Sequence, residues 1–219
     1  MTARYNGLAD WYDERFREGA EDNRPYLLEL LGQGTGRCLD LGCGTGWNLA
    51  TIEQTGRSVV GADRSSDQLR LARTRSDAPL VELDGAHLPF RDGAFSTVTT
   101  LWISTDVDDF AGTIREAARV LEPGGVLISY GVHPCFNGPH VEYHEDGART
   151  AHTTYRESGR HQPAPYWSDE GIRANVGMRH LPLAEFLTTF LQAGLAIERV
   201  MEPREDPVPH ALAVRTRRL

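Results

Sequence analysis

The chain contains no lysine, because all 23 basic residues among its 219 are arginine. A Schiff-base lysine or a lysine general base is therefore excluded, and the arginine bias fits a GC-rich bacterial genome. Cysteine is scarce as well, since Cys38, Cys43 and Cys135 are the three in the chain. An odd number of cysteines, two of them in or beside a glycine-rich turn, argues against a disulfide framework or a zinc cluster.

Long apolar runs and net positive charge are also missing. No run of about 18 apolar residues could form a membrane-spanning helix, and residues 1–16 are too polar for a signal peptide. The formal net charge is −8, whereas nucleic-acid-binding proteins usually present a basic face. We therefore expect a soluble cytoplasmic protein, a monomer or homodimer, that contacts neither nucleic acid nor membrane.

Strand and helix signals alternate over the first 130 residues, which predicts an α/β domain with a mostly parallel sheet. We expect strands at 37–41, 58–62, 80–83, 95–101 and 126–130, and helices at 8–19, 24–31, 47–55, 67–75 (with Ser66 as N-cap) and 109–121. A helix at 183–193 and strands near 195–201 and 210–215 complete a doubly wound, Rossmann-like sheet of seven strands.

A glycine-rich turn follows the first predicted strand. Asp40 precedes three glycines at alternate positions, Gly42, Gly44 and Gly46. Because glycine has no Cβ, such a turn lets a ligand lie directly against the main chain. The spacing differs from the G-x-G-x-x-G of dinucleotide folds, where a pyrophosphate meets the helix N-terminus. A carboxylate before the turn suits a cationic ligand better; a tight turn without a ligand is the alternative.

The segment Asp40-Leu41-Gly42-Cys43-Gly44-Thr45-Gly46 resembles the first motif of class I S-adenosylmethionine-dependent methyltransferases, of the small-molecule type with a type 11 methyltransferase domain. In that family the loop holds the methionine part of the cofactor, and the carboxylate approaches its amino group. The similarity continues through residues 95–108 and 117–125, so it spans about residues 35–130. It implies S-adenosyl-L-methionine as the cofactor.

Two further acidic residues, Asp63 and Asp84, follow the second and third predicted strands. Ligands of open α/β sheets lie outside the carboxyl ends of the strands, so Asp40, Asp63 and Asp84 should line one crevice. The alternatives are an exposed helix cap for Asp63 and an ordinary Asp-Gly turn for Asp84. The resemblance implies that Asp63 binds the ribose, with Arg64 and Gln68 beside the adenosine, and that the segment from Asp84 meets the adenine.

The segment from Tyr5 to Asp13 resembles the Y-D-x-x-A-x-x-Y-D lid of small-molecule methyltransferases, with Asn6 in place of the first Asp. The resemblance implies that Tyr5 and Tyr12 close over the cofactor; plain helix packing of the aromatic residues is the alternative. The complete set of expected cofactor-binding residues is Tyr5, Tyr12, Asp40, Gly42, Cys43, Gly44, Thr45, Gly46, Asn48, Asp63, Arg64, Gln68, Asp84, Gly85, Ala86 and Leu101.

Regular patterning stops between His133 and His180, which predicts an inserted substrate cap after the fifth strand. One domain over 1–219 would then comprise a helical lid (1–34), a cofactor-binding core (35–132), the cap (133–181) and a C-terminal helix with strands (182–219). The pair His140-x-x-x-His144 lacks helical periodicity and a metalloprotease motif, so we expect no metal site. The expected substrate-binding residues are Trp102, His133, Tyr166, Trp167 and Arg179.

The reaction implied by the resemblance is an in-line displacement at the methyl carbon of a sulfonium, with oxygen or nitrogen of a small molecule as acceptor. Many relatives carry a histidine after the fourth strand, where this chain reads Ile103-Ser104-Thr105-Asp106. His133, directly after the fifth predicted strand, is the first candidate for a catalytic base, and His180 at the end of the cap is the second; a surface position or packing within the cap is the alternative for both. A cofactor-binding module without turnover and an NAD-dependent oxidoreductase are the competing functions, the latter disfavoured by the glycine spacing and the lack of lysine.

Overall fold

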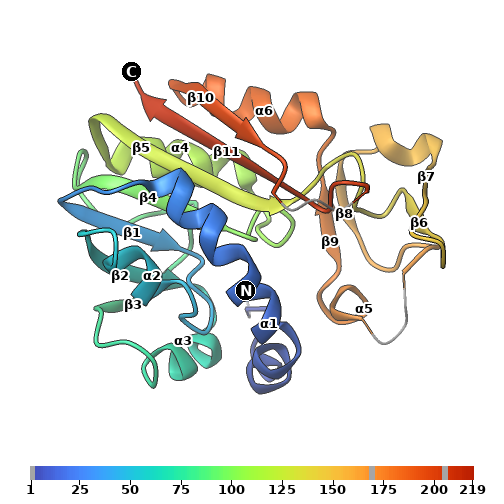
Figure 1. The fold of residues 1–219 in the computed structure, drawn as a ribbon, viewed down its shortest axis with the longest axis horizontal. Helices are drawn as coiled ribbons and strands as arrows, with labels where there is room; N and C mark the ends of the chain where they lie inside the picture. The colour runs from blue at the N-terminus through green and yellow to red at the C-terminus, as the bar shows by residue number, and fades with distance from the viewer. Residues whose placement is uncertain (1–2, 168–170, 204–206) are drawn as a thin grey trace.

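The computed structural model describes residues 3–167, 171–203 and 207–219. Its main sheet has seven strands in the order β10-β11-β5-β4-β1-β2-β3 (Figure 1). Strands β1 (Arg37–Leu41), β2 (Ser58–Asp63), β3 (Leu80–Glu82), β4 (Phe95–Leu101) and β5 (Leu121–Val132) are parallel. Strands β10 (Leu195–Met201) and β11 (Ala211–Arg218) add an antiparallel pair beside β5. The predicted α/β fold with a mostly parallel seven-stranded sheet is confirmed.

Helices cover both faces of the sheet, which is why the central strands are apolar on both sides. Helices α1 (Ala9–Leu31), α2 (Leu49–Glu53) and α3 (Ser66–Ala72) bury Leu30, Leu49 and Leu69 in one core cluster. Helices α4 (Phe110–Val120) and α6 (Leu183–Gln192) bury three phenylalanines in the other cluster, where the rings of Phe110 and Phe186 stack at 5.4 Å. Each fully buried Leu or Phe side chain stabilises the fold by roughly 1.5–3 kcal/mol.

The N-terminal helix differs from its prediction. The structure has one continuous helix, α1, with Pro25 inside it, where the sequence indicates two shorter helices. The polar residues around Asp22 look like an interruption because they carry no apolar face. Asn23 is nevertheless buried, and it accepts a hydrogen bond of 2.6 Å from the Tyr130 hydroxyl of β5. This buried contact fixes the middle of the helix against the sheet.

Several other element ends differ from expectation by a few residues, and two of them have a clear cause in the structure. Ser65, not Ser66, caps α3, because its hydroxyl accepts a hydrogen bond from the Gln68 amide at 3.2 Å. Strand β5 begins at Leu121, before the predicted 126, since Leu121 pairs with Phe95 ahead of an irregularity in the register. Both changes lie at element ends and leave the carboxyl ends of the strands where the sequence predicts them.

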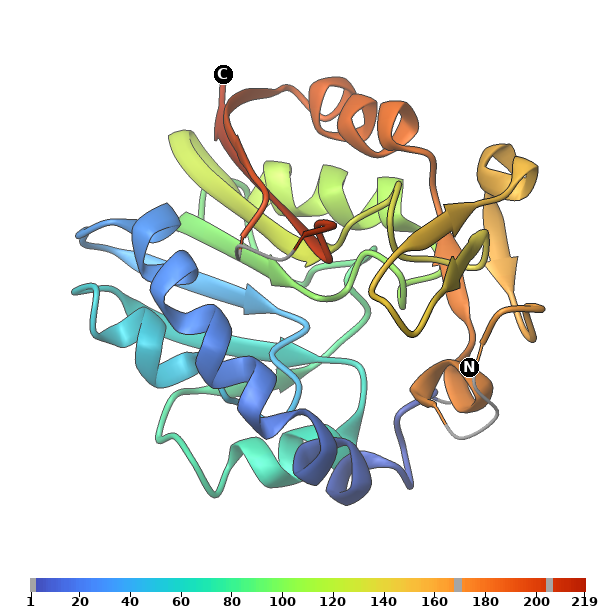
Figure 2. The ribbon, with the colours of Figure 1, turned by 45° about the vertical axis from the view of Figure 1, so that its right-hand side comes forward.

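The expected cap, residues 133–181, lies beyond the carboxyl ends of β4 and β5 (Figures 1 and 2). It contains two small antiparallel sheets, β6 (Val141–Tyr143) with β7 (Arg149–Ala151) and β8 (Gly159–His161) with β9 (Met178–His180). A 3-10 turn (Thr153–Arg156) lies between β7 and β8, and helix α5 (Ile172–Val176) lies between β8 and β9. No helix in the described ranges is long and apolar enough to cross a membrane.

Candidate functional site

A cavity of about 310 Å³ opens at the carboxyl ends of β1, β2 and β4. This size lies at the lower end of the range for small-molecule sites. The lining comes from the segment before α1, the glycine turn, the turns after β2 and β3, the loop after β4 and the start of α4. The residues are Ala3, Arg4, Tyr5, Tyr12, Leu41, Gly42, Gly44, Asp63, Arg64, Ser65, Gln68, Leu83, Asp84, Gly85, Ala86, His87, Leu101, Trp102, Ile103, Asp106, Val107, Asp108, Asp109 and Thr113.

The glycine turn forms the floor of this cavity, and its geometry requires glycine. Gly42 and Gly44 have φ values of 80° and 55°, in the left-handed region that other residues rarely adopt. A Cβ at Gly42 would lie 2.2 Å from the Cγ2 atom of Ile103. The amides of Gly42 and Cys43 both donate to the Ala62 carbonyl, which fixes the turn to β2. At Gly42 the missing side chain makes room for Ile103, whereas at Gly44 the nearest atom to a Cβ would be the Gln68 Oε1 at 3.7 Å, so a ligand can approach the main chain there.

Five residues of the expected cofactor set, Asp40, Cys43, Thr45, Gly46 and Asn48, do not line the cavity. Cys43 is buried in the core, and burial raises the pKa of its thiol. Gly46 packs closely against α3, because a Cβ on Gly46 would lie 3.1 Å from the Cα atom of Ala72. These residues shape the turn from behind.

Asp40 lies behind the glycine turn rather than on the cavity wall. Its side chain is fully buried, and its Oδ1 accepts a hydrogen bond of 2.7 Å from the Thr99 hydroxyl. The Oδ2 atom has no hydrogen-bond partner. Burial, with a smaller contribution from Asp63, raises the pKa of Asp40 to about 7. A buried, unpaired carboxylate oxygen is unfavourable, and a nearby cation would relieve it.

Asp63 does lie on the cavity wall, where it joins two turns. Its Oδ2 accepts from the Gly44 amide at 2.9 Å and its Oδ1 from the Ser65 amide at 2.8 Å. Burial raises the pKa of Asp63, while these backbone hydrogen bonds oppose the rise. Because each carboxylate oxygen has two lone pairs, the group can still accept from two vicinal hydroxyls.

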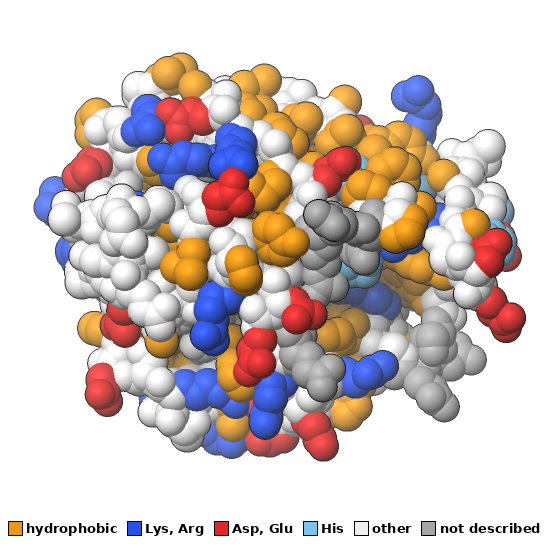
Figure 3. Space-filling model, viewed as in Figure 1, with side chains coloured by type: hydrophobic (Ala, Val, Ile, Leu, Met, Phe, Trp, Pro, Cys, Tyr) orange, Lys and Arg blue, Asp and Glu red, His pale blue; other side chains and the backbone are white. Residues whose placement is uncertain are grey.

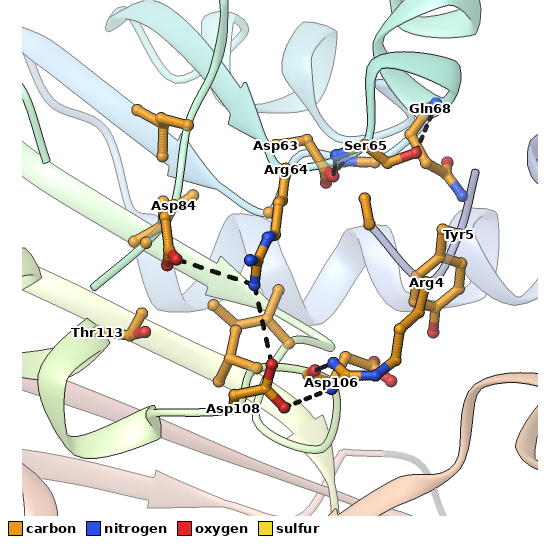
Figure 4. Close-up of a pocket in the computed structure, with 18 of the residues that line it drawn as sticks. Arg4, Tyr5, Asp63, Arg64, Ser65, Gln68, Asp84, Asp106, Asp108 and Thr113 are labelled. Atoms are coloured by element: carbon orange, nitrogen blue, oxygen red, sulfur yellow. Dashed lines mark hydrogen bonds and ion pairs between the residues drawn. The ribbon is translucent and has the colours of Figure 1, made fainter. Parts of the chain in front are cut away.

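Arg64 reaches across the cavity between carboxylates of two opposite walls (Figure 4). Its Nη1 lies 3.8 Å from an oxygen of Asp84 and 3.8 Å from an oxygen of Asp108. The other oxygen of Asp84 accepts from the Ala86 amide at 3.1 Å, which is an ordinary Asp turn. Asp84 thus forms the ordinary Asp-Gly turn that we considered as its alternative role, and it also lines the cavity.

The lid residues Tyr5 and Tyr12 both line the cavity, with their ring centroids 5.3 Å apart and edge to face. Tyr12 also packs on Phe16 at 4.7 Å, so the packing role that we considered for these aromatics coexists with their place on the cavity wall. Burial raises the pKa of Tyr12 to about 12 and that of Tyr5 well above its usual value. Both hydroxyls therefore stay protonated at neutral pH and act as donors rather than bases.

The lid is fastened to the core by polar contacts that sequence reasoning missed. Asp13 accepts from the Trp47 indole at 2.8 Å and from Arg75 at 2.5 Å. The Ser65 hydroxyl donates to Asn6 at 2.7 Å, so the amide that replaces the first Asp of the lid pattern is used in this contact. The bonded residues are 34 to 62 positions apart in the sequence, so no local sequence pattern could predict these contacts.

The two candidate bases, His133 and His180, do not line the cavity. His133 is buried, accepts from the Cys135 amide and donates to Glu202 at 3.0 Å, and burial lowers its pKa. His180 donates to the Tyr155 carbonyl at 2.8 Å, and burial lowers its pKa to about 4. These surroundings correspond to the packing role within the cap that we considered as the alternative.

Of the expected substrate-binding residues, Trp102 alone lines the cavity. It has a φ of 63°, which is rare outside glycine, and it packs on Tyr130 with ring centroids 5.3 Å apart. Tyr166 instead stacks on His152 at 4.2 Å, and Arg179 lines a separate cavity of about 20 Å³. Trp167 and His133 likewise lie outside the lining of the large cavity.

Sequence reasoning also missed several lining residues, among them Arg4, His87, Asp106 and Asp108. A signal existed for Asp106, which stands in the segment after β4 that departs from the histidine-containing pattern. Arg4 has no such signal, because its contact with Asp108 spans 104 residues. Within the described residues, no three His, Cys, Asp or Glu side chains gather in a group that could hold a metal ion.

The sheet order with its antiparallel edge pair, the glycine turn after β1 and the acidic residues after β2 and β3 agree with the resemblance to class I S-adenosylmethionine-dependent methyltransferases. Comparison with known proteins agrees. Residues 39–129 match the family model described as a methyltransferase domain. These residues form a methyltransferase domain, and the chain is similar to S-adenosylmethionine-dependent methyltransferases.

Individual relatives give the extent of this similarity. Demethylmenaquinone methyltransferase of Corynebacterium kroppenstedtii is 39% identical over 111 residues, which is 49% of this chain and 48% of that protein. The enzyme of the same name from Tropheryma whipplei is 36% identical over 133 residues, 57% of this chain and 55% of that protein. The chain spans about half the length of the curated relatives it matches.

A solved structure extends the similarity to most of the chain. The S-adenosylmethionine-dependent methyltransferase from Mesorhizobium loti superposes with a TM-score of 0.74 at 26% sequence identity. The match covers 90% of this chain and 98% of that one. The structural similarity therefore extends beyond residues 39–129, the segment that the family model matches.

Proposed function

We propose that this chain transfers the methyl group of S-adenosylmethionine to oxygen or nitrogen of a small-molecule acceptor. The observation that carries the proposal is the cavity whose wall combines the bare main chain of Gly42 and Gly44 with the carboxylates of Asp63 and Asp84. A backbone without side chains, beside two carboxylates at strand ends, suits a nucleoside that bears an amino acid.

The residues present fit this cofactor. The Oδ2 atom of Asp40 is buried without a partner, and an ammonium group approaching the glycine turn would neutralise it. The Oε1 atom of Gln68 is also buried without a partner and lies beside Gly44, 3.7 Å from where a Cβ would stand. Asp63 would hold the ribose hydroxyls, and Asp84 would accept from the exocyclic amine of adenine.

Bound S-adenosylmethionine supplies an activated methyl group: the acceptor atom bonds to the methyl carbon as the carbon–sulfur bond breaks, and the electron pair stays on sulfur. The protein's part is alignment and exclusion of water. Orientation alone can contribute about 7–11 kcal/mol. Tyr5, Tyr12 and Trp102 wall the cavity with rings, and the two phenols stay neutral hydrogen-bond donors at physiological pH.

A small acceptor is supported by the concave, lid-covered site and by the printed function of the relatives, which methylate a demethylmenaquinone. In the face shown in Figure 3, acidic and basic side chains intermingle and neither sign dominates, which supports the expectation that nucleic acid is not the substrate. A cytoplasmic location and a monomeric or homodimeric state stay predictions.

The second candidate is a cofactor-binding module without methyl transfer. It is favoured by one observation: among the described parts of the chain, none of the cap histidines proposed as bases reaches the cavity. An acceptor that needs no help to lose its proton would make such a base unnecessary, so the enzyme remains the better-supported proposal.

Isothermal titration with S-adenosylmethionine, S-adenosylhomocysteine and NAD tests the cofactor. We expect binding of the first two, and weakening by at least about tenfold in Asp63→Ala, because a charged hydrogen bond contributes about 1.5–3 kcal/mol. Asp146→Ala, in an exposed loop of the cap, is the control and should leave affinity unchanged. Preference for NAD, or unchanged affinity in Asp63→Ala, would contradict the proposal.

Turnover requires a separate experiment. Labelled methyl donor should be offered with phenols, amines and carboxylic acids, and transfer to one of these classes is the expected result. Tight cofactor binding without any labelled product across the three classes would favour the binding module.

A further inference from the structure

The loop after β4, residues 102–109, forms the wall of the cavity nearest the cap. Trp102, Ile103, Asp106, Val107, Asp108 and Asp109 all line the cavity. The loop begins with strained backbone, since Trp102 has a φ of 63°. A non-glycine residue in that conformation persists only where its surroundings impose it. The loop therefore depends on contacts from outside itself.

The cap supplies several of those contacts through arginines. Arg173 of α5 donates from Nη1 to Oδ1 of Asp106 at 2.8 Å and from Nη2 to the Thr105 hydroxyl at 3.1 Å. Arg160 of β8 donates to the Asp106 carbonyl at 2.8 Å. The Arg179 amide donates to the Thr105 carbonyl at 2.7 Å. No described residue of the cap lines the cavity itself, so these contacts are the route by which the cap acts on it.

The lid meets the same loop from the opposite side. Arg4 donates to the Asp106 carbonyl at 3.2 Å and to the Asp108 carboxylate at 2.5 Å (Figure 4). Tyr5 and Asp106 both line the cavity, and the charge of Asp106 raises the pKa of Tyr5 while that of Arg173 lowers it. The Asp106 carboxylate thus stands between an arginine of the cap and a tyrosine of the lid.

We propose that Arg173 is a positioning residue for the cofactor site: it fixes the Asp106 carboxylate and the Thr105 hydroxyl, and so holds the cap-side wall of the cavity in place beside Tyr5 and the bound cofactor. The guanidinium fork bonds two different residues of the loop at once, which an ammonium group cannot reproduce. Both partners are about four-fifths buried, so loss of either leaves a poorly solvated charge beside the cavity. This proposal rests on the proposed function, because it assumes that the cavity binds S-adenosylmethionine and its product.

Calorimetric titration with S-adenosylhomocysteine tests the proposal without knowledge of the acceptor. Arg173→Ala and Asp106→Asn should each weaken binding about tenfold, which corresponds to about 1.4 kcal/mol. The double variant should bind no more weakly than the weaker single variant, because both changes break the same contact. Arg149→Ala is the matched control, since this cap arginine donates to the carbonyls of Phe136 and Pro209 and not to the loop; it should stay within about twofold of wild type.

Arg173→Lys separates positioning from folding, and thermal unfolding is measured for every variant. The lysine keeps the charge and can still bond the Asp106 carboxylate but not both loop residues in the same geometry, so its affinity should lie between those of Arg173→Ala and the wild type; if Arg173→Ala does not fold, the cycle is built on Arg173→Lys. Three results would overturn the proposal: unchanged affinity in Arg173→Ala, multiplicative effects in the double variant, or equal weakening by Arg149→Ala. Failure of the wild-type protein to bind S-adenosylhomocysteine would instead refute the proposed function.

Discussion

At the scale of single residues, the most informative group is Asp40, because the sequence and the structure place it differently. The sequence puts it at the end of a strand beside Asp63 and Asp84, which suggests three carboxylates on one rim. The structure buries it behind the glycine turn with one oxygen unpaired. Strand alternation explains the difference: a residue still within β1 points into the core, whereas Asp63 and Asp84 stand at or after strand ends.

This placement predicts a proton release on ligand binding. The pKa of Asp40, usually about 3.9, is raised to about 7 by burial, so about half of the ligand-free molecules carry the proton at pH 7. An ammonium group at the glycine turn would stabilise the ionised form and expel that proton. Binding of S-adenosylhomocysteine at pH 7, titrated in buffers of different ionisation enthalpy, should therefore release about half a proton.

The release should vanish in Asp40→Asn and persist in Asp84→Asn, which removes a carboxylate from the wall and leaves Asp40 in place. Raising the pH to 8 should diminish the release in the wild-type protein, because Asp40 is then largely ionised before binding. An equal proton release in wild type and Asp40→Asn would show that another group is responsible.

At the scale of elements, sequence reasoning succeeded where the periodicity is local and failed where long-range contacts decide. The strands before the glycine turn and after it have short apolar runs with clear ends, and β4 has the predicted bounds. The sequence pattern wrongly predicts two helices in place of α1, because the hydrogen bond that buries Asn23 comes from Tyr130, 107 residues away. The cap could not be decoded, since its strands of three residues owe their place to contacts such as those of Arg173.

The first helix offers the prediction for this scale. Burial opposes ionisation of Asp13, yet hydrogen bonds from Arg75 and its neighbours hold the pKa of that carboxyl below its usual range. Asp13→Ala should free the start of α1 from the glycine turn, destabilise the protein by about 1–3 kcal/mol and raise the dissociation rate of S-adenosylhomocysteine about tenfold. Stopped-flow fluorescence of Trp47 and urea denaturation measure the two effects.

The control for this prediction is Asp10→Ala. Asp10 lies on α1 like Asp13, but its ion pair with Arg70 of α3 is exposed. An exposed pair contributes about 0–1 kcal/mol, so both the dissociation rate and the stability should stay near their wild-type values. Equal dissociation rates in the Asp13 and Asp10 variants would mean that the lid is not held through Asp13. The stabilising effect of Asp13 is present above pH 4 and is lost as the pH falls through the lowered pKa.

At the scale of the whole molecule, buried histidines connect segments of the cap that lie far apart in the sequence. His180 donates to Tyr155 and lies 4.5 Å from the His140 ring, and His140 donates to the Cys135 carbonyl at 3.2 Å. Burial lowers the pKa of both imidazoles. Their neutral forms suit the closed structure, and protonation in the unfolded chain occurs at a higher pH than in the folded one.

This arrangement predicts that acid weakens the whole fold over a defined range. The folded pKa of His180 is about 4 against about 6.5 in the unfolded chain, so the unfolded chain binds more protons between these values. Stability therefore falls as the pH is lowered, by about 2 kcal/mol from pH 7 to pH 5 for this group alone. Urea denaturation at the two pH values measures the loss, which His180→Gln should reduce, whereas His144→Gln, on an exposed side chain, should leave it unchanged. A pH dependence identical in wild type and His180→Gln would exclude His180 as the group that links acidity to the stability of the fold.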